Sequence, residues 1–307
     1  MRAKRHTRGK KLNATRKKQR GGAMPDIYIV YFAYLDVGNQ NWDNSRAKTL
    51  ILEQLKELND MGLADAAKKI DIVITAPKNS NFNNSSILKL DKATRNIKAL
   101  SETIKKKIVI HGERGNSFEY SGLRRVWDIA KLIHEDDPSR SDNSIILYFH
   151  SKGMSNGNKN NIKTPENKML TDMVIKPWKE IAERFASEPK LNKAGHSGAN
   201  DGWIWFNFWW VRASYVYGPK MRSPRPILTE RRHYYEDWLG RRVPTDDKSD
   251  TDNSKKDKER EVGTMSGVYD SLSLCQEGPS TKLGLGLHPA FDKCPVEKPE
   301  YKIASGP

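Results

Sequence analysis

Hydrophobic residues along this chain follow two kinds of pattern, continuous runs and runs at helical spacing. Continuous apolar runs are typical of strands buried on both faces, and four occur in the first half of the chain: 27–34, 70–75, 107–110 and 144–149. Between them, apolar residues recur every three or four positions, which predicts helices over 45–61, 88–104 and 120–133. Strands that alternate with helices predict an α/β fold, with a mostly parallel central sheet flanked by helices.

The pattern beyond residue 150 is less regular. It predicts a helix over 168–186 with a kink at Pro177, a strand in the tryptophan-rich run 203–210 and a helix that begins near Thr229. Two stretches rich in Asn, Ser or acidic residues are predicted as loops, 78–86 and 135–138. The elements together predict a single Rossmann-like domain.

Such a domain commonly binds a nucleotide at the carboxyl ends of its strands. No Gly-x-Gly-x-x-Gly or Walker pattern follows the first apolar run. The sequence therefore argues against a dinucleotide-binding or P-loop protein.

Positive charge is concentrated at the N-terminus. The chain has a formal net charge of +16, and ten Lys or Arg residues with no acid lie within residues 1–20, which leaves +6 for the rest. We expect residues 1–24 to be a disordered basic arm, which is either a nucleic-acid-binding tail, a nuclear address or a solvated extension. The arm has no apolar core and is not a secretory signal.

The end of the chain is poor in apolar residues. Residues 244–262 are predicted to be a disordered charged segment, and residues 263–307 an irregular tail. The two cysteines, Cys275 and Cys294, have no partners at zinc-binding spacing and indicate a reducing compartment. No stretch approaches the ~20 apolar residues of a membrane span, so we expect a cytoplasmic protein without a signal peptide or transmembrane segment.

Aromatic residues gather where binding chemistry is expected. Four of the eight tryptophans lie between Trp203 and Trp210, and an acidic and aromatic segment follows at 235–240. Tryptophan combines a flat face with an N–H donor, which suits stacking on sugar rings or bases. A third segment, Tyr148–Gly153, ends the fourth predicted strand with His150, Ser151 and Lys152.

These three segments occur in a fixed order: Leu147–Gly153, Asn207–Arg212 and Glu236–Gly240. The set resembles a family of GT-A-type glycosyltransferases found in large DNA viruses, of the chlorella-virus and mimivirus kind, and in bacterial polysaccharide loci. The resemblance covers residues 27–241. It implies that the chain transfers a sugar from a nucleotide-sugar donor, UDP-linked, to a saccharide or glycan acceptor. If the chain is viral, the resemblance also implies that the protein acts in the host cytoplasm.

The same resemblance divides the chain. It implies a GT-A-like domain over 25–243, with a nucleotide-sugar-binding half over 25–153 and an acceptor half over 154–243. Transferases of this type usually carry an Asp-x-Asp pair at the end of the strand that closes the first half, and the pair holds a divalent cation. This chain has His150, Ser151 and Lys152 there instead.

The missing Asp-x-Asp pair changes the expected chemistry. A lysine can place a positive charge beside the departing diphosphate without a metal. A divalent cation, Mn²⁺ or Mg²⁺, held by other carboxylates is the alternative, and we assign no metal ligand. The residues expected to bind the donor diphosphate are His150, Ser151, Lys152, Arg212 and Arg232. Arg231 is a further candidate, although any of the arginines could equally be a solvated charge, and His150 and Lys152 a polar strand end.

Glu236 and Asp237 are the expected catalytic residues, because an acidic residue from a similar Glu-Asp element deprotonates the acceptor in inverting enzymes of this type. Aromatic neighbours that desolvate a carboxylate raise its pKa and make it a better base. The sequence does not decide between the two, and both could instead be acids that favour a helix N-terminus. The expected acceptor-binding residues are Asn207, Trp209, Trp210 and Trp238, with one of the two adjacent tryptophans in the core and the other lining the cleft.

The nucleotide itself is expected at the ends of the first and third strands. The candidate residues are Tyr34, Asp36 and Glu119, and Glu113 and Tyr120 flank the same region. Glu119 could alternatively serve as a helix cap.

Two other classes of function compete with the transferase. A nucleic-acid-binding protein would use the basic arm together with the aromatic run, although that run is flanked by Gly198, Asn200 and Asp201 rather than by basic residues. A carbohydrate-binding protein without catalysis would need the aromatic residues but not a nucleotide-binding half.

Overall fold

A computed structural model of the protein describes residues 23–35, 42–77, 81–114, 119–151, 163–196, 204–219, 221, 223–224, 226, 235, 238–240 and 268–270. Residues 1–22 of the expected basic arm, the charged segment 244–262 and the start of the helix expected near Thr229 lie outside these described residues.

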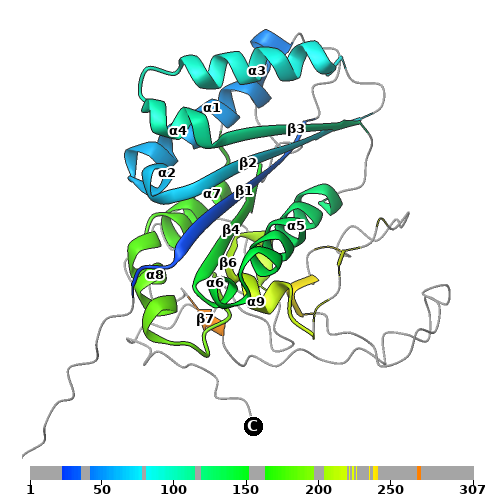
Figure 1. The fold of residues 1–307 in the computed structure, drawn as a ribbon. Helices are drawn as coiled ribbons and strands as arrows, with labels where there is room; N and C mark the ends of the chain where they lie inside the picture. Colours follow the sequence, from blue (N-terminus) through cyan, green and yellow to red (C-terminus); the bar gives the residue numbers. More distant parts are fainter. Residues whose placement is uncertain are drawn as a thin grey trace, which may run out of the picture.

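A seven-stranded mixed sheet forms the centre of the described structure, with the strand order β3-β2-β1-β4-β6-β5-β7 (Figure 1). The strands are β1 (Asp26–Tyr34), β2 (Ala67–Ala76), β3 (Ile108–Arg114), β4 (Ser144–His150), β5 (Lys193–Gly195), β6 (Trp209–Arg212) and β7 (Val268–Asp270). The first four strands pair in parallel with one another, whereas β6 runs antiparallel to β4 and β5, and β7 is parallel to β5. The predicted α/β fold with a mostly parallel sheet is confirmed, and it is compatible with a Rossmann-like arrangement.

Helices cover both faces of this sheet. The α-helices are α1 (Arg46–Asp60), α2 (Leu63–Ala66), α3 (Asn84–Asn96), α4 (Glu102–Lys107), α5 (Tyr120–Asp136), α6 (Pro138–Asp142), α7 (Pro165–Leu170), α8 (Trp178–Ser187) and α9 (Ala213–Val216). Shorter helical turns are η1 (Trp42–Asn44), the π-helical η2 (Thr171–Ile175), η3 (Trp205–Asn207) and η4 (Trp238–Gly240). One face carries α1, α7 and α8, and the other carries α5 and α9.

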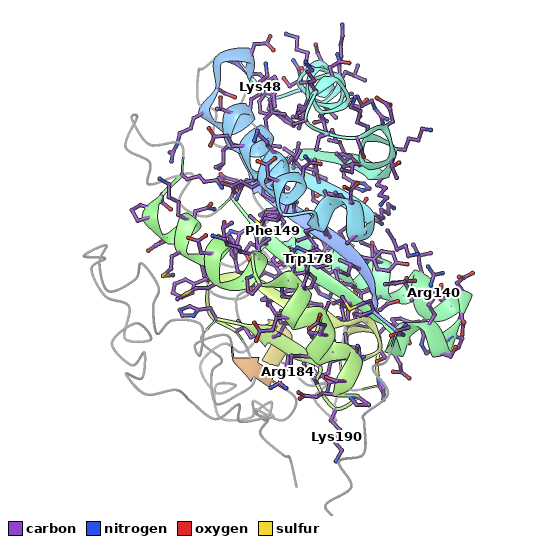
Figure 2. The ribbon with its side chains drawn as sticks, turned by 90° about the vertical axis from the view of Figure 1, so that its left-hand side faces the viewer. Lys48, Arg140, Phe149, Trp178, Arg184 and Lys190 are labelled. Carbon is purple, nitrogen blue, oxygen red and sulfur yellow. The ribbon has the colours of Figure 1, made fainter. Side chains whose placement is uncertain are left out.

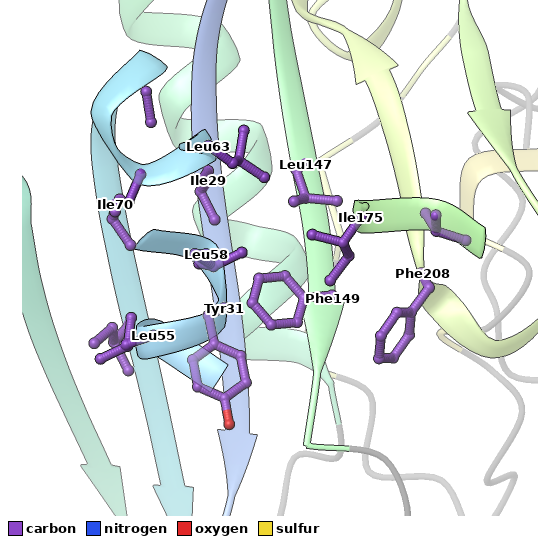
Figure 3. Close-up of a cluster of buried hydrophobic side chains, with 14 of the residues drawn as sticks. Ile29, Tyr31, Leu55, Leu58, Leu63, Ile70, Leu147, Phe149, Ile175 and Phe208 are labelled. Atoms are coloured by element: carbon purple, nitrogen blue, oxygen red, sulfur yellow. The ribbon is translucent and has the colours of Figure 1, made fainter. Parts of the chain in front are cut away.

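The core is divided into two layers by the sheet, because successive side chains of a strand point to opposite faces. Ile29 and Tyr31 of β1 join the layer beneath α1, whereas Val30 and Phe32 join the layer beneath α5. In the first layer the rings of Tyr31 and Phe149 stack with centroids 4.6 Å apart (Figure 3). The continuous apolar run of β1 thus reflects burial on both faces.

Close contacts fix the helices onto the sheet. Ser45 caps α1 by accepting a hydrogen bond from the Lys48 amide. Where α8 meets the end of α1, the Trp178 indole donates to the Met61 carbonyl at 3.0 Å (Figure 2). On the other face α5 approaches the sheet through Gly122, where an added Cβ would lie 2.8 Å from Phe32. A side chain at this position would push α5 away from the sheet.

Two predicted loops contain helix starts instead. Asn83, within the expected loop 78–86, forms a capping box with Ser86 and begins α3. Asp137, within the expected loop 135–138, caps α6 by accepting from the Ser139 amide. Residues that favour turns also favour N-caps, because both bring a side-chain oxygen to free backbone N–H groups.

Two predicted helices are interrupted. The helix expected over 88–104 is two helices, and Ser101 caps the second of them, α4. The helix expected over 168–186 is divided into α7, the π-helical η2 and α8, and Pro177 precedes α8. The strand expected over 203–210 is shorter, because η3 precedes β6. Within the tail expected to be irregular, Val268–Asp270 pairs with β5.

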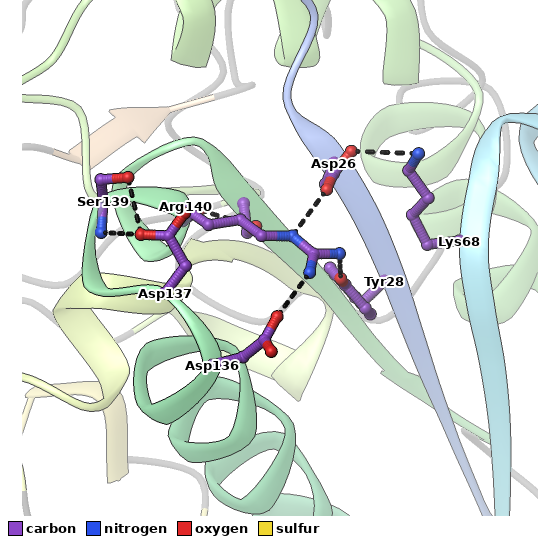
Figure 4. Close-up of polar contacts among 8 residues, drawn as sticks. Asp26, Tyr28, Lys68, Asp136, Asp137, Ser139 and Arg140 are labelled. Atoms are coloured by element: carbon purple, nitrogen blue, oxygen red, sulfur yellow. Dashed lines mark hydrogen bonds and ion pairs between the residues drawn. The ribbon is translucent and has the colours of Figure 1, made fainter.

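Ionic contacts tie the helices to the amino ends of the strands. The Arg140 guanidinium of α6 donates to Asp26 at 3.1 Å, to the Tyr28 hydroxyl at 2.8 Å and to Asp136 at 3.0 Å (Figure 4). Lys68 lies 3.4 Å from the other carboxylate oxygen of Asp26. This end of the sheet is therefore closed by structural contacts.

Candidate functional site

The carboxyl end of the sheet contains a topological switch point between β1 and β4. From β1 the chain adds β2 and then β3 on one side, and it later returns to add β4 on the other side. Ligands of open α/β sheets bind outside the carboxyl ends of the strands at such a point. Tyr34 and His150 end the two strands that flank it.

Ser151 joins the ends of β1 and β4. Its amide donates to the Phe32 carbonyl at 2.9 Å, and its hydroxyl accepts from the Tyr34 amide at 3.2 Å and donates to the Tyr34 carbonyl at 3.4 Å. Tyr34 and Ser151, expected to bind nucleotide and diphosphate respectively, are thus brought together. The buried Ser151 hydroxyl is engaged by the backbone of β1.

A polar cluster lies beside this junction and consists of His150, Glu119 and Asn207. The His150 Nδ1 atom is 3.7 Å from the Glu119 carboxylate, and the Asn207 side-chain amide donates to the other oxygen of that carboxylate. Only 12% of the His150 side chain and 15% of the Glu119 side chain are exposed. We call these three residues the His150–Glu119–Asn207 cluster.

The backbone at Phe206 and Asn207 adopts the left-handed region, with φ of 69° and 51°. For Phe206 this conformation costs roughly 1–3 kcal/mol, whereas asparagine adopts it more readily, and such strained residues recur at functional sites. His150 stabilises this turn by donating from Nε2 to the Phe206 carbonyl at 2.8 Å. The Asn207 side chain stabilises it further, because its amide donates to the Tyr235 carbonyl at 3.4 Å and its oxygen accepts from the Trp209 indole at 3.1 Å.

The aromatic residues form the floor beneath the cluster. Trp209 is fully buried and stacks on Tyr148 with ring centroids 4.8 Å apart, and its ring lies 6.4 Å from that of Trp238. Trp210 faces the opposite layer, where its indole donates to the Val174 carbonyl at 2.8 Å. Both adjacent tryptophans are therefore core residues of the described structure, and Trp238 is also buried.

Burial controls the protonation of two further groups near the turn. Burial lowers the pKa of His196, which follows β5, to about 4, so this imidazole is neutral near pH 7. Its ring lies nearly parallel to that of Phe206, with centroids 6.4 Å apart. Burial, and secondarily the charge of Glu119, raises the pKa of the Tyr148 hydroxyl.

Arg212 lies away from the cluster. It pairs with Ile145, at the opposite end of β4 from His150. Its guanidinium donates to the carbonyls of Leu191 at 2.9 Å, Phe185 at 2.9 Å and Glu188 at 3.1 Å, and also to that of Asp142. Burial lowers the pKa of this guanidinium. Arg212, expected to bind diphosphate, instead serves the fold at the amino ends of the strands.

The remaining flanking residues are near the start of α5. Glu113 of β3 accepts a hydrogen bond from the Ser121 hydroxyl, and the ring of Tyr120 lies 6.2 Å from that of Tyr235. Glu119 precedes α5, but its side chain makes no capping hydrogen bond within the described structure, so the alternative helix-cap role is not supported.

Six expected site residues lie outside the described residues: Asp36, Lys152, Arg231, Arg232, Glu236 and Asp237. Tyr235 and Trp238 flank two of them in sequence. Tyr235 accepts a hydrogen bond from Asn207 of the cluster, and the Trp238 ring lies 6.4 Å from that of Trp209.

The sequence did not single out Phe206 or His196. A left-handed residue and a buried neutral histidine leave no spacing signal, whereas Tyr235 belongs to a segment already noted.

Two searches are limited to the described part of the chain. No group of three or more His, Cys, Asp or Glu side chains suited to a metal ion occurs there. None of the described helices has both the length and the apolar character needed to cross a membrane. Comparison with protein-family models, with curated proteins and with solved structures finds no match.

Proposed function

We propose that this protein is a glycosyltransferase that moves a sugar from a nucleotide-sugar donor, UDP-linked, to a saccharide or glycan acceptor. One observation carries the proposal: segments far apart in sequence meet at the carboxyl ends of β1 and β4. His150 comes from the first segment of the family resemblance, Asn207 from the second and Trp238 from the third. The three segments contact one another from Tyr148 to Trp209 and from Trp209 to Trp238, and His150 also donates to the carbonyl of Phe206, the residue before the second segment.

Three features support a ligand at this place. It lies at a switch point of an α/β sheet, where ligands of such sheets bind. It combines a partly buried carboxylate with a histidine, and the backbone beside them is held in a costly conformation. The mixed sheet is compatible with the GT-A-type fold that the resemblance implies.

The proposed reaction is a substitution at the anomeric carbon of the donor sugar. The acceptor oxygen forms a bond to that carbon while the bond to the diphosphate oxygen breaks, and the electron pair leaves with the nucleoside diphosphate. Glu236 or Asp237 takes the proton of the acceptor hydroxyl. Lys152 and Arg232 neutralise the departing diphosphate, unless Mn²⁺ or Mg²⁺ supplies that charge. We assign recognition of the nucleotide to Tyr34, Asp36 and Glu119.

Binding and turnover of nucleotide sugars by the full chain test this proposal. UDP-hexoses, GDP-hexoses and free nucleotides are titrated by calorimetry with Mn²⁺ or with EDTA, and release of UDP is followed in the presence of simple saccharides. We expect selective binding of UDP-linked donors. EDTA-resistant turnover would support Lys152 as the charge that replaces a metal.

Variants assign the roles. Glu236→Gln and Asp237→Asn are compared with Asp172→Asn, which removes an exposed carboxylate from η2. We expect the variant that removes the base to lose about 10²–10⁴-fold in turnover while donor affinity is retained. The contrary outcome is that no nucleotide sugar binds, while the full chain binds single-stranded nucleic acid in a salt-sensitive manner that deletion of residues 1–22 abolishes.

A further inference from the structure

His150 makes a contact that fixes where one of its protons lies. A backbone carbonyl can only accept a hydrogen bond, and the Phe206 carbonyl is 2.8 Å from the His150 Nε2 atom. Nε2 therefore carries a proton in this arrangement. In a neutral imidazole the other nitrogen, Nδ1, would then present a lone pair.

The lone pair of a neutral His150 would face a carboxylate. The Nδ1 atom lies 3.7 Å from a Glu119 oxygen, and both side chains are more than four-fifths buried. A lone pair directed at a carboxylate is repulsive, and burial weakens the screening of that repulsion by water. A second proton on His150 turns the repulsion into an ion pair.

Other described titratable groups lie on the elements beside this pair. They are Tyr34 on β1, Glu113 on β3, Tyr120 on α5, Tyr148 on β4, His196 after β5 and Tyr235. Burial keeps His196 neutral, since its pKa is lowered to about 4, and keeps Tyr148 protonated, since its pKa is raised. Neither of these two groups supplies a competing charge near neutral pH, and within the described part of the chain the Glu119 carboxylate lies at ion-pair distance from His150.

Glu119 also contacts the left-handed turn at Asn207. Its second oxygen accepts a hydrogen bond from the Asn207 amide, and the same amide reaches the Tyr235 carbonyl. The carboxylate therefore connects the imidazole on β4 with the backbone that precedes β6.

We propose that Glu119 is a positioning residue that keeps His150 protonated on both ring nitrogens, and that this pair holds the turn at Asn207 in place. Both nitrogens of His150 are then directed at protein acceptors. His150 shapes the site and does not itself bind the diphosphate, contrary to the expectation from sequence. The inference rests on the proposed function only in identifying the ligand beside the turn as a nucleotide sugar.

The protonation of His150 can be measured without any ligand. Side-chain ¹⁵N spectra of the ¹⁵N-labelled full chain distinguish doubly protonated imidazole from each neutral tautomer. At pH 7.5, where a free histidine is mostly neutral, we expect both nitrogens of His150 to be protonated. In Glu119→Gln we expect the neutral form with the proton on Nε2. Glu183→Gln, which removes an exposed carboxylate of α8, should leave the His150 signals unchanged.

Neutral His150 in the wild-type protein, or doubly protonated His150 in Glu119→Gln, would overturn the inference. Glu119→Asp keeps a charge and covers the case in which the amide variant does not fold. We expect it to retain at least part of the doubly protonated signal, and a fully neutral His150 in a folded Glu119→Asp protein would count against charge as the cause.

A ligand measurement separates this inference from the proposed function. We expect Glu119→Gln to weaken UDP-hexose binding by about tenfold, because the turn at Asn207 loses the charged acceptor of its hydrogen bond, while Glu183→Gln binds as wild type. If the wild-type protein shows the doubly protonated His150 but binds no nucleotide sugar, the proposed function fails and the positioning role stands. If it binds UDP-hexose but its His150 is neutral, the positioning role fails alone.

Discussion

Trp209 and Trp210 illustrate how two adjacent side chains of the same type serve different layers. Because both are tryptophans, the sequence suggested that they stack on a ligand. Each ring instead fills a separate part of the core, and each indole N–H already has a protein acceptor. Residue type alone cannot separate these roles, because a buried indole needs an acceptor just as a sugar-binding indole does. The alternation of the strand predicted that the two would diverge, although not that both would be buried.

Replacement of Trp210 tests this assignment to the core. Trp210→Phe keeps an aromatic ring but leaves the Val174 carbonyl without its donor and leaves a small void. We expect a loss of about 2–4 kcal/mol in the free energy of unfolding, measured by urea denaturation. Nucleotide-sugar affinity of the folded variant should be unchanged. A large loss of affinity without a loss of stability would place Trp210 in the binding site.

His196 predicts a pH dependence of stability. Its pKa is about 4 in the folded protein, and that of an unfolded histidine is about 6.5. Between these values the unfolded chain binds a proton that the folded protein does not, so stability falls as pH decreases from 6.5 to 4. The loss amounts to about 3 kcal/mol at the acidic end. Urea denaturation at several pH values should show a shallower slope in His196→Gln than in the wild type or in His134→Gln.

Secondary-structure elements divide into those that the sequence predicted and those that it did not. Strands with continuous apolar runs and the long helices α1 and α5 were predicted close to their observed bounds, because burial on one or two faces is visible in the apolar pattern. The break between α3 and α4 and the short helix α6 were missed, since the capping residues Ser101 and Asp137 are of types that also favour turns. The turn before β6 was missed because its left-handed residues are held by contacts with β4 and α5, which are distant in sequence.

The cap of α3 gives a prediction at this level. Asn83 accepts a hydrogen bond from the Ser86 amide at 3.1 Å, and its loss leaves that N–H without this partner. We expect Asn83→Ala to lower the free energy of unfolding by about 1 kcal/mol. Asn84→Ala, one position inside the helix, should change it by less than about 0.5 kcal/mol. Equal effects of the two variants would argue against the cap.

In the molecule as a whole, the arginines that stabilise the fold and the candidate site lie at opposite ends of the sheet. Arg140 and Arg212 tie the amino ends of the strands to the surrounding helices and loops, whereas the His150–Glu119–Asn207 cluster lies at the carboxyl ends. From the sequence, a ligand site is expected at the carboxyl ends of the strands, and this location stays a prediction. The sequence could not place Arg212, because an arginine at the end of a strand can face either a ligand or backbone carbonyls.

Substitution of Arg212 tests that separation. The planar guanidinium of Arg212 donates to four carbonyls, and a lysine ammonium cannot reach all of them. We therefore expect Arg212→Lys to lower the free energy of unfolding by more than about 3 kcal/mol. The affinity for UDP-hexose, measured by calorimetry below the melting temperature, should remain within about twofold of wild type. A selective loss of affinity in a stable variant would return Arg212 to the donor site. Lys190→Ala, on the exposed surface, is the control for both measurements (Figure 2).

The turn at Phe206 and Asn207 restricts which sequences this fold can accept. Val, Ile and Thr are poorly tolerated at positive φ, whereas Gly, Asn and Asp adopt it readily. Natural variation at position 207 should therefore be confined to a few residue types, even where the neighbouring aromatic residues are substituted. Phenylalanine adopts positive φ less readily. A phenylalanine retained at position 206 in natural variants would therefore indicate a constraint other than backbone geometry.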